Sequence, residues 1–146
     1  MDLYQLLKQD HLKAKRLFER LDQEAETAKA RERLFAELKQ ELELHTAVEE
    51  KYFYPALRDH DETSELVEEA LEEHEEVKTL LAELDEGDKE EEGWADQLLE
   101  LQEDVEEHVE EEETELFPKA QKLIDKVKAD EIAKAIEQEK AAAKAK

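Results

Sequence analysis

The chain has 146 residues, of which 45% are charged and 5% are aromatic, and its formal net charge is −24. This acidic excess argues against binding to nucleic acid or to anionic membrane surfaces, because both require clusters of Lys and Arg. The absence of Cys excludes disulfides, zinc thiolate sites and iron–sulfur clusters. A chain of this length can bury an apolar core, and its apolar residues are periodic, so we expect a folded domain rather than disorder.

Nearly the whole chain is predicted to be helical, because it contains only two Gly and two Pro and lacks strand-like alternation. We expect a first helix from residue 2 to the early twenties, with its end somewhere in residues 22–27. A second helix should begin near residue 29 and run to residue 54 or a turn beyond, where Pro55 should kink or end it.

Two more helices are expected in the second half of the chain. The third should begin after an N-cap at Thr63 or Ser64 and stop near Gly87. The fourth should open at Trp94 and continue past the second Pro as far as Val127.

Four helices with short connections predict an all-α fold, an antiparallel up-down-up-down four-helix bundle over residues 1–128. Residues 129–146 should form a C-terminal helical extension with a frayed tail. The start of the chain lacks a basic region followed by an apolar run, and no later stretch is apolar enough to span a bilayer. We therefore expect a cytoplasmic protein without a membrane partner, and we expect it to be a monomer.

One sequence plan occurs twice. The stretch from His45 to Pro55 reappears 63 residues later as His108 to Pro118, and in both copies the His is followed four residues on by Glu and later by an aromatic-Pro pair. The same offset of 63 residues relates a His on the first helix to a His on the third. The chain is therefore predicted to be two copies of one helical hairpin, related by approximate two-fold symmetry.

The repeated His and Glu residues are predicted to bind metal. A His and a Glu four residues apart lie about 40° apart around a helix, one turn along, so both side chains can reach one point inside the bundle. Burying them without a metal would cost on the order of several kcal/mol for each unpaired charge. Imidazole and carboxylate ligands suit iron or manganese, and also zinc, better than calcium or magnesium. The predicted ligands are His11, His45, Glu49, His74, His108 and Glu112.

Neighbouring acidic residues compete for these roles. Glu111 faces inward nearly as well as Glu112, but the matching position of the first copy is Val48, so the repeat selects Glu112. Glu50 and Glu113 also recur, yet they lie about 100° further round the helix and are expected at the margin of the site or in solvent.

Two other polar side chains lie near the motif in the sequence. His60 has Leu123 at its repeat position and is therefore expected to be an exposed residue of the central loop. Tyr52 lies one turn beyond Glu49 on the same face, where its hydroxyl is placed to donate a hydrogen bond near the metals.

Over about residues 3–128 this pattern resembles the hemerythrin-like (HHE cation-binding) proteins, because six residue types stand at matching spacings. The resemblance implies a carboxylate-bridged non-haem di-iron centre, with two Fe ions joined by an oxo or hydroxo bridge, inside an antiparallel four-helix bundle. By the family's roles, His11 and His45 would bind one iron, His74 and His108 the other, and Glu49 and Glu112 both.

The chain departs from the oxygen-carrying members of that family at one ligand. Those carriers have a further His four residues after the third-helix ligand, where this chain has Lys78, and they use a longer spacing for the second carboxylate. The second iron is therefore predicted to be one nitrogen short. This departure favours oxygen or peroxide chemistry, or sensing, over simple reversible oxygen carriage.

The predicted function is di-iron binding coupled to binding, storage or sensing of dioxygen or a related small ligand. An enzyme acting on peroxide or ferrous iron at the same site, or an iron-sensing or metal-handling protein, remains an alternative, because no general acid, base or nucleophile beyond the ligands can be nominated. The ferritin-like di-iron enzymes share the bundle, but their Glu-x-x-His order is absent here.

Overall fold

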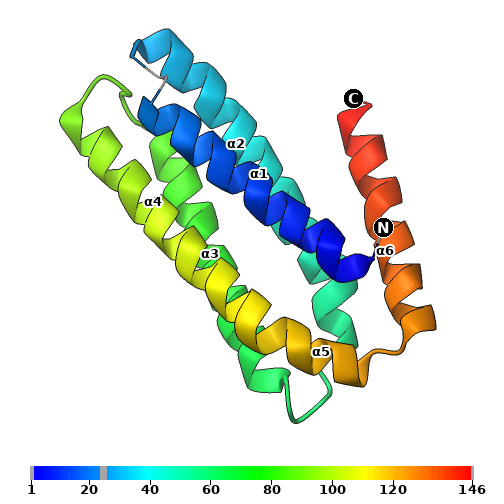
Figure 1. Cartoon of the computed structure of the whole chain (residues 1–146). Helices are drawn as coiled ribbons and strands as arrows, with labels where there is room; N and C mark the ends of the chain where they lie inside the picture. Colours follow the sequence, from blue (N-terminus) through cyan, green and yellow to red (C-terminus); the bar gives the residue numbers. More distant parts are fainter. Residues whose placement is uncertain (1, 24–25, 146) are drawn as a thin grey trace.

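The computed structural model describes residues 2–23 and 26–145, and all regular secondary structure in those ranges is helical. Four long helices form two antiparallel hairpins that pack side by side (Figure 1). Their bounds are α1 Leu3–Gln23, α2 Ala28–Val48, α3 Ser64–Glu86 and α4 Glu92–Glu111. The predicted four-helix bundle is therefore confirmed. The first helix ends inside the predicted interval, of which residues 24 and 25 lie outside the described ranges.

The loops between the helices use local contacts that only partly match the expected caps. Thr27 caps α2, because its hydroxyl accepts a hydrogen bond from the Ala30 amide at 3.1 Å. Thr63 occupies the N-cap position of α3, but its buried hydroxyl donates to the Leu57 carbonyl at 2.7 Å instead. Gly87 ends α3 in an extended conformation, and a Cβ there would lie 3.2 Å from Trp94 Cδ1. Gly87 is therefore suited to close packing against Trp94 rather than to a left-handed turn.

Each hairpin's second helix widens into one π turn next to its Pro. The first π turn, η1 Glu49–Phe53, is followed by a short 3₁₀ segment, η2 Tyr54–Ala56. The second, η3 Glu112–Leu116, is followed by α5 Phe117–Leu123. Pro has no amide hydrogen and clashes with the preceding turn, so it disfavours an unbroken α-helix at these points. The repeat thus extends to the backbone conformation, which periodicity alone did not predict.

The last helix, α6 Lys126–Lys144, folds back against the bundle instead of continuing α4. Ile124 is extended, with φ −105° and ψ 118°, so the chain turns there and the predicted continuation of the fourth helix to Val127 is wrong. Helix α6 packs on α1, α2 and η1 and lies beside the α1–α2 hairpin (Figure 1). Its buried side chains, Ala129, Ile132, Ala133 and Ile136, follow the spacing of an amphipathic helix.

The apolar core is divided into two clusters. One contains Leu3, Leu7, Phe53, Phe117 and the buried face of α6. The other contains Phe18, Phe35, Leu38, Leu81 and Trp94. On α1, α2 and α3 the buried His lies, along the helix, between residues of one cluster and residues of the other. None of the helices described by the structure is both long enough and apolar enough to cross a membrane.

Candidate metal centre

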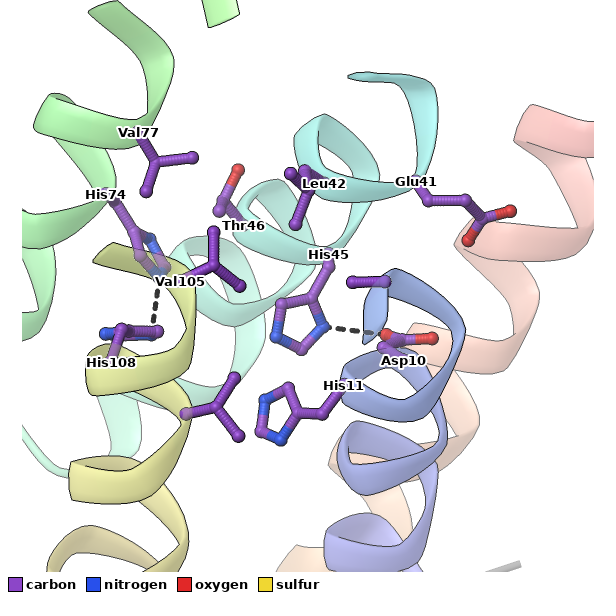
Figure 2. Close-up of a pocket in the computed structure, with 12 residues that line it drawn as sticks. Asp10, His11, Glu41, Leu42, His45, Thr46, His74, Val77, Val105 and His108 are labelled. Atoms are coloured by element: carbon purple, nitrogen blue, oxygen red, sulfur yellow. Dashed lines mark hydrogen bonds and ion pairs between the residues drawn. The ribbon is translucent and has the colours of Figure 1, made fainter. Parts of the chain in front are cut away.

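The six predicted ligands lie together inside the bundle, and each is at most 7% exposed. Each of the four long helices supplies one imidazole, and the four rings converge in the bundle interior (Figure 2). The two carboxylates begin the two π turns. Ordered by helix, these residues are His11 on α1, His45 on α2, His74 on α3, His108 on α4, Glu49 on η1 and Glu112 on η3.

The ligand atoms fall into two groups that share a carboxylate. In the first, donor atoms of His11, His45, Glu49 and Glu112 all lie within 4.8 Å of one another. In the second, donor atoms of Glu49, His74 and His108 also lie within 4.8 Å of one another. Glu49 Oε1 is 3.1 Å from Nε2 of His45 and 3.2 Å from Nε2 of His74.

Glu112 makes the corresponding contacts from the other hairpin. Its Oε1 is 3.1 Å from Nε2 of His11, and its Oε2 is 3.3 Å from Nε2 of His108. Each carboxylate therefore contacts imidazoles of both hairpins. This is the arrangement that two cations sharing two carboxylates would require.

A ring of outer carboxylates fixes the orientation of the imidazoles. In the first hairpin Asp10, the residue before the α1 His, accepts a hydrogen bond from His45 Nδ1 at 2.7 Å. In the second hairpin Glu73, the residue before the α3 His, accepts one from His108 Nδ1 at 2.7 Å. An Nδ1–H donated outward leaves the Nε2 lone pair for a metal at the centre. Asp10 and Glu73 are separated by the same 63 residues, so their recurrence was a signal that the sequence interpretation missed.

The other two outer contacts cross between the hairpins. Glu50 Oε2 lies 2.8 Å from Nδ1 of His74, and Glu113 Oε2 lies 2.6 Å from Nδ1 of His11. Both carboxylates are partly exposed, at the margin where they were expected. Their function as imidazole partners was not predicted, although their recurrence in the repeat pointed to it.

Tyr54, to which the sequence analysis assigned no role, contacts three of the predicted ligands. Its hydroxyl lies 2.6 Å from Glu112 Oε2, 3.1 Å from Glu49 Oε1 and 3.2 Å from His74 Nε2. Tyr52, which was expected to donate near the metals, instead donates to Glu139 at 2.7 Å. Tyr54 and Glu49 are fully buried.

The π turn explains this exchange of roles. In an α-helix a residue five positions on lies about 140° round, away from the starting face. The Tyr54 amide instead donates to the Glu49 carbonyl across the wide turn, which brings the two side chains to one face. In the second copy the Phe117 amide donates to the Glu112 carbonyl, and its ring stacks on His11 at 6.1 Å between centroids.

The electrostatics of the cluster favour positive charge at its centre. Burial by itself would lower the pKa of His45. The charge of Glu49 and the hydrogen bond to Asp10 outweigh burial, so the pKa of His45 is raised to about 10. Burial raises the pKa of Glu49, but the charge of His45 and surrounding hydrogen bonds hold it well below its ordinary value. Burial and the nearby carboxylates raise the pKa of Tyr54 well above its ordinary value, so its hydroxyl stays protonated.

Two buried atoms of the cluster that could bind a metal have no hydrogen-bond partner among the residues that the structure describes. They are Glu49 Oε2 and His45 Nε2, which lies near Glu49 Oε1 without hydrogen-bond geometry. A buried polar atom without a partner costs free energy, and native structures contain few of them. A cation held by these atoms would remove that cost. The donor set therefore fits a metal.

A cavity of about 20 Å³ adjoins the imidazoles, and Figure 2 shows the side chains around it. Its other walls are mainly apolar and come in repeat-related pairs, Ala14 with Val77, Leu42 with Val105 and Thr46 with Val109. A volume of about 10–15 Å³ on this measure is enough for one water molecule. The space is thus suited to a molecule of two or three atoms.

Lys78 and His60, which were also considered in the sequence, lie away from the atoms that could bind a metal. Lys78 is 41% exposed at its side chain and contacts Glu50 Oε2 at 3.1 Å, so it pairs with an outer carboxylate. His60 lies in the turn before α3, where its carbonyl accepts from the amides of Thr63 and Ser64. Neither belongs to the described groups of possible metal ligands.

Two of three comparisons relate this chain to known proteins. A comparison with curated proteins finds no match. A crystal structure of a hemerythrin HHE cation binding domain-containing protein from Mycobacterium kansasii matches with a TM-score of 0.86 and 26% identity, covering 98% of this chain and 87% of that one. The family model of the hemerythrin HHE cation binding domain matches residues 2–120, which include all six predicted ligands and both π turns. The chain therefore belongs to the hemerythrin HHE cation-binding family.

Proposed function

We propose that this protein holds two iron ions in the buried His and Glu cluster and binds dioxygen or a related small ligand beside them. One iron would be held by His11 and His45 and the other by His74 and His108. Glu49 and Glu112 would reach both, with an oxo or hydroxo bridge between the ions. The observation that carries the proposal is that both carboxylates lie between imidazoles of both hairpins.

The donor chemistry supports iron over harder cations. Four imidazole nitrogens and two carboxylates are typical of iron, manganese or zinc sites and not of calcium or magnesium sites. Iron bound there would supply one-electron redox chemistry and coordination positions for oxygen-derived ligands. The protein's own contribution is to orient the imidazoles through four outer carboxylates and to keep bulk water away from them.

The small apolar cavity supports an exogenous ligand of very small size. Its walls offer mainly methyl groups beyond the imidazoles. Such walls admit an apolar diatomic molecule at little desolvation cost and leave few polar groups to hold a larger metabolite. Lys78 does not replace the carriers' additional His, because it pairs with Glu50. The second iron would therefore have one ligand fewer from the protein, and a water, a reoriented Glu or the exogenous ligand would take that position.

A second function, chemistry on peroxide or on ferrous iron, is favoured by Tyr54. Its protonated hydroxyl contacts both shared carboxylates and belongs to the core cluster opposite the apolar wall of the cavity. Reduction of an oxygen-derived ligand consumes protons, and a general acid must lie beside the reacting atoms. Tyr54 does not line the small cavity, so it would act as general acid only toward a ligand bound on its own side of the ions.

The two functions separate in one experiment on the iron-loaded protein. Anaerobic ferrous protein is exposed to oxygen, its visible spectrum is followed, and oxygen is then removed. Full return of the starting spectrum supports ligand binding, storage or sensing. Repeated consumption of added peroxide, lost in Tyr54→Phe, supports an enzyme. A spectrum that responds to neither reagent contradicts both functions.

A further inference from the structure

Helix α6 reaches the outer ring of the candidate metal centre through one side chain. Lys140 Nζ donates to Asp10 Oδ2, the same oxygen that accepts from His45 Nδ1. The side chains of Lys140 and Asp10 are only 14% and 10% exposed. Two consecutive hydrogen bonds therefore connect the last helix of the chain to one predicted iron ligand.

This connection breaks the symmetry of the two hairpins. The repeat counterpart of Asp10 is Glu73, which accepts from His108 in the same way but has another acidic residue, Glu111, as its neighbour instead of a Lys. The cation comes from α6, which has no counterpart in the repeat and lies beyond the residues matched by the family model. Asp10 and Glu73 are therefore alike in geometry and unlike in charge. Lys78 places a second ammonium on an outer carboxylate, at Glu50 Oε2, which faces His74 Nδ1. The Lys78 side chain is 41% exposed whereas that of Lys140 is 14% exposed, so solvent screens the charge of Lys78 more strongly.

The charge difference acts on the electron donation of the imidazole. A carboxylate that accepts from Nδ1 makes the imidazole a stronger donor to a metal at Nε2. An ammonium on the same carboxylate oxygen draws charge away from that hydrogen bond, and in a buried setting its own field is weakly screened. Both effects disfavour the more highly charged, oxidised state of a metal held by His45.

We propose that Lys140 is a positioning residue that acts through Asp10 on His45 and raises the reduction potential of the iron held by His11 and His45. The inference rests on the proposed di-iron function. It assigns to α6 a role in tuning the centre beyond covering the α1–α2 hairpin.

The test compares iron content, melting temperature and midpoint potential in the full-length iron-loaded protein and three variants. Lys140→Met removes the cation and keeps an apolar chain, whereas Lys140→Arg keeps the cation. Lys51→Met is the matched control, because it removes the ion pair of Lys51 with Glu139 of α6, 2.6 Å long, without touching an imidazole partner.

Lys140→Met should keep its iron and shift the midpoint potential downward. At a fixed potential the ratio of oxidised to reduced iron should rise about tenfold, ~59 mV for one electron. Lys140→Arg and Lys51→Met should remain at the wild-type potential. An unchanged potential in Lys140→Met, or an equal shift in Lys51→Met, would overturn the proposal while leaving the di-iron function standing. Wild-type protein that takes up no iron would overturn both.

Discussion

The two hairpins use the same plan for holding ligands and different side chains for the chemistry around them. Repeat-related contacts agree closely, as in the 2.7 Å hydrogen bonds of Asp10 with His45 and of Glu73 with His108. The differences are concentrated at positions that touch the ligands without being ligands. Where one copy places the hydroxyl of Tyr54 on both carboxylates, the other places the ring of Phe117 on His11. The repeated residues thus supply the predicted metal ligands. The residues that differ between the copies, such as Tyr54 and Phe117, make the surroundings of the two half-sites different.

Removing a ligand should produce the largest effect. His74→Ala or Glu112→Ala takes away a buried donor of the cluster, so the iron content of purified protein should fall sharply. His60→Ala should retain wild-type iron, because that residue lies in the turn before α3. Metal analysis per chain checks this, and equal loss in all three variants would contradict the ligand assignment.

The outer carboxylates test whether the two sides are held equally. Glu50→Gln and Glu113→Gln each weaken one partner of an imidazole across the hairpins, and each should lower metal affinity by about 10–100-fold. Competition with a chelator measures the affinity, and Glu107→Gln is the exposed control. A loss confined to one of the two variants would argue against the two-fold plan.

Tyr54 and Tyr4 are both buried, so replacing each with Phe tests what the hydroxyl contacts of Tyr54 contribute to stability. Tyr54→Phe removes a donor to two buried carboxylates, so the free energy of unfolding of metal-free protein should fall by about 1–3 kcal/mol. Tyr4→Phe removes a buried hydroxyl that has no hydrogen-bond partner within residues 2–23 and 26–145, so stability should stay the same or rise. Denaturant unfolding of both variants checks the contrast, and equal destabilisation would mean that the hydroxyl contacts of Tyr54 contribute nothing.

The smallest effect is expected at Lys78, the position of the carriers' extra His. Lys78→Met breaks a partly exposed ion pair with Glu50, which is worth at most about 1 kcal/mol. Iron content should not change, because the ammonium contacts only carboxylates outside the donor set. Loss of iron in this variant would show that Lys78 supports the centre more directly than its contacts indicate.

The repeat explains why the bundle and the donor cluster could be predicted from sequence. Residues that match in type at one long offset must have equivalent environments in the two hairpins, and four inward imidazoles are not needed for packing. The choice of Glu112 over Glu111 agrees with the structure, where Glu112 is 2% exposed and Glu111 is an exposed side chain. The helix-face argument was sufficient wherever the backbone stayed α-helical.

The helix-face argument was wrong where the backbone forms a π turn instead of an α-helix. It placed Tyr52 near the ligands by counting 3.6 residues per turn through a segment that forms a π turn. Pro55 in the sequence indicates a break in the α-helix there, but it does not specify whether the helix ends, kinks or widens into a π turn. The docking of α6 was missed for a related reason, because an amphipathic face does not reveal which surface it covers.

The most direct test of the account is the iron content per chain of anaerobically loaded protein, followed by its near-ultraviolet and visible spectrum before and after exposure to air. The account predicts two irons per chain and oxo-to-iron charge-transfer bands that appear in air. A single iron, no stoichiometric iron, or a colourless site filled with zinc would contradict the shared di-iron centre, and the proposed oxygen chemistry would have to be abandoned.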